Sequence, residues 1–141
     1  MPPALPKTRL DPLVRWKARA LEQTKRLLAE KLTRLAAARA RVAQASALLD
    51  RAPPERADAA AWDLQDRVSA AGRSALVSLE QEVAVAEAEI QVAQAACVEA
   101  NRETEVFRRA SERERSRLLQ EIERRERHTM DELAILLRDR R

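Results

Sequence analysis

Residues 14–49, VRWKARALEQTKRLLAEKLTRLAAARARVAQASALL, carry an apolar side chain at every seventh position without exception. We call these six positions the first row: Val14, Leu21, Leu28, Leu35, Val42 and Leu49. A strict seven-residue repeat is typical of a coiled coil, because an average of about 3.5 residues per turn keeps one side chain facing a partner helix. A weaker companion row runs beside it through Ala18, Leu32, Ala38 and Ala45. The stretch therefore predicts a long helix packed along another helix.

The second half of the chain contains a matching row, in which apolar or small side chains alternate at intervals of three and four. This second row consists of Leu76, Leu79, Val83, Ala86, Ile90, Ala93, Cys97, Ala100, Thr104, Phe107 and Ser111. The two rows have the same length. We therefore expect residues 14–49 to pack antiparallel against residues 76–111.

The charges favour the same pairing. Residues 7–51 contain 12 basic and four acidic residues, a balance of +8, whereas residues 76–107 contain one basic and seven acidic residues, a balance of −6. Opposite charges beside two facing rows favour this pairing over self-association of like helices, although each exposed ion pair contributes only about 0.2 to 1 kcal/mol.

Proline and glycine predict where the helices begin and end. The prolines near the start predict a flexible leader over residues 1–11, with Asp11 as the cap of a first helix over residues 12–51. Pro53-Pro54 interrupts that helix, because the residue before a proline is pushed out of helical geometry. We expect residues 52–75, which include Gly72, to connect it to a second helix over residues 76–141. Within this connection, residues 56–71 form a short helix or helical start with Trp62, Leu64 and Val68 on its buried side.

These segments predict one domain, residues 1–141, with an all-α fold. It is an antiparallel two-helix coiled-coil hairpin with an overlong C-terminal helix. A tight turn at Pro53-Pro54 is the alternative register, and it would set residues 14–49 against residues 58–93. That register leaves half of the acidic segment without basic partners, so we favour the longer connection.

The residues beyond Ser111 extend past the start of the first helix in this arrangement. Their apolar positions continue at looser spacing through Leu118, Ile122, Thr129, Leu133, Leu136 and Leu137. A helix with an apolar stripe and no internal partner is only marginally stable in water. We therefore expect this segment to bind an external partner.

The composition argues against several other classes of protein. The 141 residues include one Gly, one Phe, one His, one Cys and no Tyr, and 35% of them are charged. These counts disfavour a sheet fold, a Gly-rich phosphate loop and a zinc site. We expect no catalytic residue, cofactor, metal or small-molecule substrate. Without a disulfide, a secretory signal or a stretch able to span a membrane, the sequence predicts a soluble cytoplasmic protein.

Residues 108–127 hold eight Arg and five Glu. Their spacing predicts a solvated helix face with Glu–Arg pairs four residues apart. A docking surface for an acidic partner and a nucleic-acid-binding basic coiled coil are alternatives. The interleaved Glu side chains repel phosphates, so we expect no nucleic-acid partner. A generic or homodimeric coiled-coil scaffold is a further alternative.

Both ends of the chain resemble one known family. Residues 9–17, RLDPLVRWK, followed by ALE at 20–22 and LLAE at 27–30, resemble the start of the flagellar export protein FliJ. Residues 126–134, ERHTMDELA, resemble the end of the same family. The chain length, the two-helix layout and the overlong second helix also agree.

This resemblance implies a non-enzymatic, cytoplasmic part of a flagellar or injectisome type III export apparatus, peripheral at the inner membrane. Proteins similar to this one form an antiparallel coiled coil like that of the stalk subunit of F-type ATPases. They enter the hexameric export ATPase and link it to the cytoplasmic domain of the export gate, and some handle export chaperones. The partner-binding residues expected by that analogy are Leu10, Leu13, Val14, Arg124, Arg125, Met130, Leu133, Leu136 and Leu137.

Overall fold

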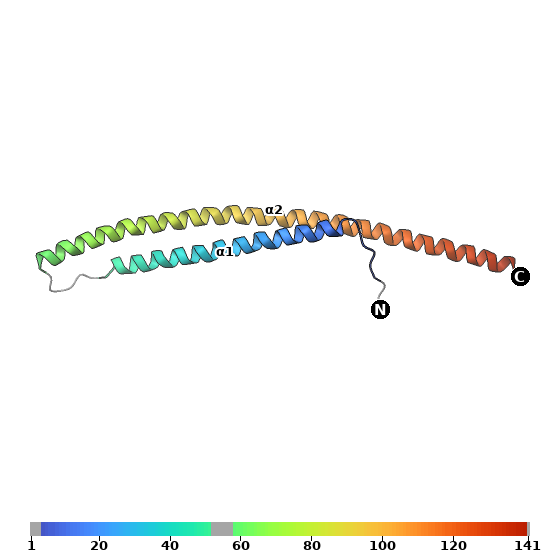
Figure 1. The fold of residues 1–141 in the computed structure, drawn as a ribbon, viewed down its shortest axis with the longest axis horizontal. Coiled ribbons are helices and arrows are strands. Elements are labelled where there is room, and N and C mark those ends of the chain that lie inside the picture. Colours follow the sequence, from blue (N-terminus) through green and yellow to red (C-terminus); the bar gives the residue numbers. More distant parts are fainter. Residues whose placement is uncertain (1–3, 52–57, 141) are drawn as a thin grey trace. The chain divides into compact units, whose positions relative to one another are not determined.

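The computed structural model describes residues 4–51 and 58–140. It contains two helices, α1 (Asp11–Leu49) and α2 (Ala59–Asp139), and no strand occurs within the described ranges. The two helices pack against each other, and the second is about twice as long as the first (Figure 1). The predicted all-α fold is confirmed.

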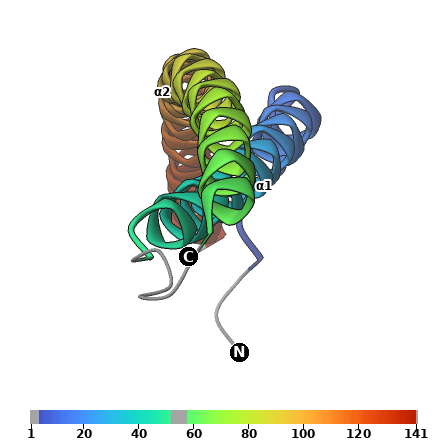
Figure 2. The same cartoon turned by 90° about the vertical axis from the view of Figure 1, so that its left-hand side faces the viewer.

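The chain divides into two compact units, and both helices contribute to each of them. Unit 1 combines Met1–Glu22 with Glu99–Arg141, and unit 2 is Gln23–Val98. Within unit 2 the helices run antiparallel, because Lys31 pairs with Glu89 and Arg41 pairs with Glu82. Figure 2 shows the end of α1 and the start of α2 in this unit.

Both rows face inward as predicted. All six positions of the first row and all eleven of the second are buried or half-buried. The most buried apolar residues are Leu21, Leu35, Ala38 and Ile90, each less than a tenth exposed. The apolar rows therefore form the core within each unit.

The companion row on α1 differs from the prediction. Leu32 is 45% exposed, whereas Lys17, Thr24 and Lys31 are half-buried and continue at intervals of seven to Ala38 and Ala45. A lysine can lay its aliphatic stem along an apolar surface and keep its ammonium group at the edge. Ala18, Ala38 and Ala45 are buried or half-buried as predicted, but Leu32 is not, and polar side chains fill other inward positions of α1.

The start of α2 corrects the predicted connection. This helix begins at Ala59 and continues through Gly72. Residues 59–71 are helical as expected, but they belong to one continuous helix with residues 76–139 rather than to a separate connection. One glycine costs a helix only about 1 kcal/mol relative to alanine, which is too little to end a long helix. Helix α1 ends at Leu49, and the expected break at Pro53-Pro54 lies outside the described residues.

Trp62, Leu64 and Val68 were expected on the buried side of the connection, and this expectation is wrong. They are 47%, 63% and 58% exposed. The half-buried positions are instead occupied by small or polar residues that extend the second row backward from Leu76: Ala61, Gln65, Ser69 and Gly72. The inward side of α2 in this segment therefore follows the second row and not the positions of the largest side chains.

A close approach and a polar contact decide the register of the rows. In unit 2, a methyl group added at Gly72 would lie 2.6 Å from Cδ2 of Leu49, which was expected opposite Leu76. In unit 1, the hydroxyl of Ser111 lies 2.9 Å from that of Thr8, although Ser111 was expected opposite Val14. The two predicted segments therefore pack antiparallel, but they are shifted along each other by about one helical turn from the predicted pairing of residues 14–49 with residues 76–111.

The predicted charge pairing between the helices is confirmed. In four ion pairs between the helices the cation belongs to α1 and the carboxylate to α2, whereas the Asp11–Arg115 pair of unit 1 has the opposite arrangement. Unit 1 contains Lys17–Glu103, and unit 2 contains Lys31–Glu89, Arg39–Glu87 and Arg41–Glu82. Most of these side chains are partly exposed, so the pairs favour the partner and orientation more than they add stability.

The variant Ile90→Asp tests the packed rows. Ile90 is 6% exposed, so this change should lower the free energy of unfolding by about 2 to 4 kcal/mol, measured by thermal melting with circular dichroism. Val98→Asp is the matched control, because Val98 is 69% exposed and should change stability by less than about 0.5 kcal/mol. Equal effects of the two substitutions would contradict the assignment of the second row.

Candidate partner-binding surface

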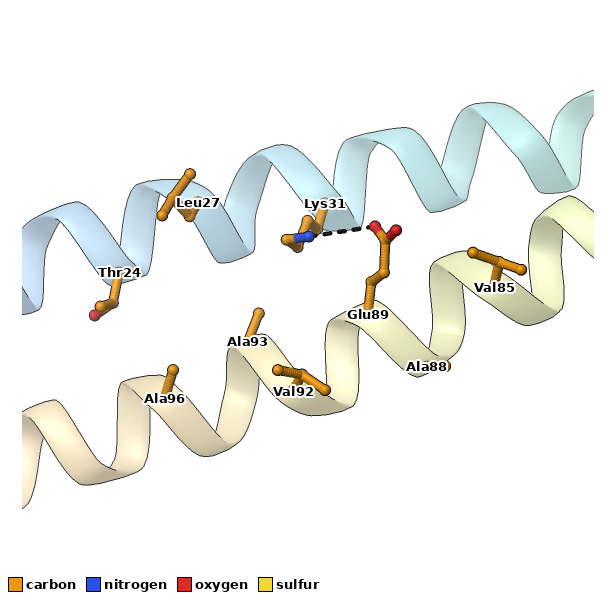
Figure 3. Close-up of a pocket in the computed structure, with 9 residues that line it drawn as sticks. All are labelled: Thr24, Leu27, Lys31, Val85, Ala88, Glu89, Val92, Ala93 and Ala96. Carbon is orange, nitrogen blue, oxygen red and sulfur yellow. Dashed lines mark hydrogen bonds and ion pairs between the residues drawn. The ribbon is translucent and has the colours of Figure 1, made fainter.

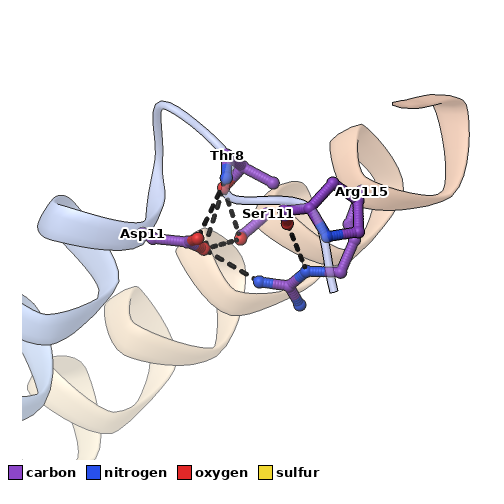
Figure 4. Close-up of polar contacts among 5 residues, drawn as sticks. Thr8, Asp11, Ser111 and Arg115 are labelled. Atoms are coloured by element: carbon purple, nitrogen blue, oxygen red, sulfur yellow. Dashed lines mark hydrogen bonds and ion pairs between the residues drawn. The ribbon is translucent and has the colours of Figure 1, made fainter. Parts of the chain in front are cut away.

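A polar cluster in unit 1 holds the start of α1 against α2 (Figure 4). The Asp11 carboxylate accepts hydrogen bonds from the Thr8 backbone N–H at 2.9 Å and the Thr8 hydroxyl at 2.8 Å. It also accepts from the Ser111 hydroxyl at 2.7 Å and from Arg115 at 3.0 Å. Arg115 Nε donates to the carbonyl oxygen of Pro6 at 3.3 Å. We call Thr8, Asp11, Ser111 and Arg115 the junction cluster.

The cluster explains how α1 begins. The bond from the Thr8 N–H to the Asp11 carboxylate is one half of a capping box, in which a side chain three residues on returns to the capping residue. Asp11 was expected to be the N-cap residue of the first helix. Its carboxylate instead faces back to Thr8 and across to α2. Thr8 and Ser111 are 6% and 3% exposed. Their hydroxyl groups are buried, and both donate hydrogen bonds to the Asp11 carboxylate.

These donors stabilise the charged form of Asp11. The Thr8 backbone hydrogen bond, then the Ser111 and Thr8 hydroxyls, hold the pKa of this carboxyl well below its usual range, and Arg115 contributes in the same direction. Partial burial opposes the shift. A carboxyl whose pKa is lowered by folding stabilises the folded state at neutral pH and loses that contribution in acid.

Lys17 fills the next inward position of unit 1. Its ammonium group pairs with Glu103 and lies 5.0 Å from the ring centroid of Trp16 and 5.7 Å from that of Phe107. The buried Thr104 hydroxyl donates to the carbonyl oxygen of Ala100 at 2.7 Å, and it lies 3.3 Å from that of Lys17. This part of the core therefore combines apolar packing with satisfied polar groups.

Two of the predicted contact residues line a groove beside the junction cluster. Leu10 is half-buried and Leu13 is 42% exposed, and a hollow of about 560 Å³ lies between them and α2. We call this hollow the start groove; its lining from α2 is Ala110, Arg113, Glu114 and Arg117, with Arg9 from the leader. Val14 is half-buried in the first row instead. Leu10 and Leu13 are therefore accessible in the start groove, whereas Val14 packs in the first row.

Helix α2 continues past the start groove with its side chains exposed. Every described residue from 116 to 140 is exposed except Glu121, which is half-buried. At about 100° per residue, seven of the eight large apolar residues of this segment fall within an arc of about 120°, on the same side as Ser111 and Arg115, whereas Ile135 lies on the opposite side. We call these seven the tail face: Leu118, Leu119, Ile122, Met130, Leu133, Leu136 and Leu137, each 37–67% exposed.

The predicted contact residues Arg124 and Arg125 both pair with Glu121, at 3.1 and 3.0 Å. Their hydrogen bonds, with Arg124 the larger contributor, lower the pKa of Glu121. By helical spacing Arg125 borders the tail face, whereas Arg124 lies on the opposite side. Of these two arginines, only Arg125 lies beside the tail face.

The structure does not bring the two groups of predicted contact residues together. Leu10 and Leu13 lie beside residues 110–117 of α2. Leu133 lies about 24 Å further along the same helix than Arg117, at about 1.5 Å per residue. The candidate surface consists of two separate parts, the start groove and the tail face.

The junction cluster was not predicted from the sequence, although two signals were present. The Thr-x-x-Asp spacing of Thr8 and Asp11 matches a capping box, and Ser111 and Arg115 are four residues apart on one helix face.

Within residues 4–51 and 58–140, no group of three or more metal-ligating side chains was found. Neither helix, over its described length, is long and apolar enough to cross a membrane.

The variant Asp11→Asn tests the junction cluster. It should lower the melting temperature at neutral pH, because it removes the charge that Ser111 and Arg115 stabilise. The difference from the wild type should shrink as the pH falls from about 4 toward the lower pKa of folded Asp11, where the wild-type carboxyl becomes protonated. Melting curves over a pH series measure this, with the exposed Asp66→Asn as control. A difference in melting temperature that stays constant with pH would contradict a stabilising role of the Asp11 charge.

A comparison with family models finds one match, described as Flagellar FliJ protein, over residues 6–141. The matched range includes both helices, the junction cluster, the start groove and the tail face. No curated protein and no solved structure was found to match the chain.

Proposed function

We propose that this chain, which belongs to the flagellar FliJ protein family, is a non-enzymatic stalk and adaptor of the export apparatus. Family membership over nearly the whole chain assigns it to the flagellar export apparatus. The finer proposal is that the tail face enters the centre of the hexameric export ATPase. The remainder of the chain then links this ring to the cytoplasmic domain of the export gate and to export chaperones.

The observation that carries this proposal is the exposed tail face. Its apolar side chains continue the side of α2 that packs against α1 near Ser111, yet no described part of the chain covers them. A contiguous apolar stripe on a surface helix is typical of a protein–protein interaction site. A ring that surrounds the helix would cover such a stripe and bury Leu133, Leu136 and Leu137.

The tail face and the junction cluster lie on the same helix within unit 1. A displacement of the tail by a partner is therefore transmitted through α2 to Ser111 and Arg115, which hold the start of α1. In this proposal ATP hydrolysis belongs to the ring. The chain alters the ring only by binding some of its conformations more tightly than others.

The proposal treats residues 1–141 as one coiled-coil domain that acts in the cytoplasm. Its association with the inner membrane is peripheral and occurs through the export gate. We assign no cofactor, small-molecule substrate or nucleic acid to it.

Replacing Leu133, Leu136 and Leu137 together with Asp tests the ATPase contact. The three side chains are 49–65% exposed, so the melting temperature should change little. Stimulation of the purified cognate export ATPase should be lost, because charges then replace the apolar contacts. Steady-state ATP hydrolysis with and without added chain measures this effect.

Ile135→Asp is the matched control. Ile135 is 60% exposed and lies about 200° around the helix from Leu133, on the opposite side. This variant should stimulate the ATPase as the wild type does. Full stimulation by the triple variant would contradict the proposed contact, and a collapse of its melting temperature would place the three leucines in the core.

The oligomeric state distinguishes the stalk from a homodimeric scaffold. We expect the purified full chain to sediment as a monomer at low micromolar concentration, because its two rows already cover each other. Analytical ultracentrifugation measures this, and a stable dimer at that concentration would contradict an intramolecular two-helix stalk.

A further inference from the structure

A furrow between the two helices of unit 2 has exposed apolar walls (Figure 3). It encloses about 460 Å³ and is lined by Thr24, Leu27, Lys31, Val85, Ala88, Glu89, Val92, Ala93 and Ala96. Leu27, Val85 and Val92 are 54%, 59% and 72% exposed. Most of the lining is therefore apolar surface that remains in water.

A second hollow of about 420 Å³ continues this furrow along the helices. The two hollows share Lys31, Val85 and Glu89, and the second extends to Arg34 and Arg41 on α1. We call the combined feature the flank furrow. From Thr24 to Arg41 it follows about 26 Å of α1, the length of about 18 helical residues.

The spacing of the lining residues suits a third helix. On α1, Leu27, Arg34 and Arg41 lie seven residues apart, and on α2, Val85 and Val92 do the same. These lining residues therefore stay on one side of each helix along the furrow. Residues at such a spacing stay aligned with an additional helix that packs along the groove.

The charges of the flank furrow select an acidic partner. Lys31 pairs with Glu89 at 3.2 Å and Arg41 pairs with Glu82 at 3.5 Å. Arg34 is exposed between these pairs, and no ion pair to it occurs among the described residues. The furrow therefore has one more cation than carboxylates, and a partner carboxylate beside Arg34 would balance it.

We propose that the flank furrow binds an amphipathic, acidic helix of a partner protein. The apolar side of that helix packs on Leu27, Val85 and Val92, and one of its carboxylates pairs with Arg34. The Lys31–Glu89 ion pair lies where the two hollows meet, and the Arg41–Glu82 pair lies in the second hollow. The site uses residues of unit 2 only, so it goes beyond the proposed ATPase contact and does not depend on it.

Two labelled peptides of about 18 residues test the proposal. Both carry Leu and Ala at the a and d positions of a heptad, and the flanking positions are Glu in one peptide and Lys in the other. Titration into the full chain, followed by fluorescence anisotropy, should show saturable binding of the Glu peptide, about tenfold tighter than the Lys peptide. Arg34→Glu should abolish or reverse this preference.

The double variant Val85→Asp, Val92→Asp should lose peptide binding while its circular dichroism stays that of the wild type, because both valines are exposed. Val98→Asp is the matched control and should keep binding, since Val98 is 69% exposed and does not line the furrow. The triple Asp variant of Leu133, Leu136 and Leu137 should also keep binding. This result separates the furrow from the tail face and from the proposed ATPase contact.

Four results would overturn the proposal: no saturable binding, equal binding of the two peptides, binding that survives the double valine variant, or binding lost in the tail variant. Sedimentation of the full chain adds a further test. A dimer that disappears in the double valine variant would identify a second copy as the occupant and would overturn the proposal of an acidic partner helix.

Discussion

The rest of the structure depends on the packing of the first row against the second, two apolar rows that each repeat every seven residues. This packing orients α1 and α2 antiparallel and buries Leu21, Leu35 and Ile90 within their units. Much of the second row is alanine, which buries little area per residue. Polar groups at the edges therefore matter more here than in a core of large side chains.

A row that repeats every seven residues packs almost equally well after a shift along the helix. Apolar contact alone consequently leaves the register weakly specified, and features that occur once must select it. The junction cluster around Asp11 is one such feature, because its hydrogen bonds form only when Ser111 lies beside Thr8. The close approach of Leu49 to Gly72 is another. These contacts exclude neighbouring registers at the two places where α1 begins and ends.

The surfaces available to partners are the apolar positions that the two rows leave uncovered. The tail face exists because α2 extends past the start of α1 and keeps apolar side chains on the same side. The flank furrow arises differently, from exposed residues of α1 and α2 that lie beside the buried rows. The two surfaces involve different residues and different units.

The sequence by itself determined the helical fold, the inward positions of both rows, the sign of the interhelical charges and the uncovered tail. These properties follow from periodicity and composition, which can be read along one chain. Only the tertiary structure decided the register, the start of α2 at Ala59, the inward Lys17 and Lys31, and the separation of Leu10 and Leu13 from the tail leucines. Repeating rows look alike at neighbouring registers, so these features depend on contacts such as Thr8–Ser111 and Leu49–Gly72 between residues far apart in the chain.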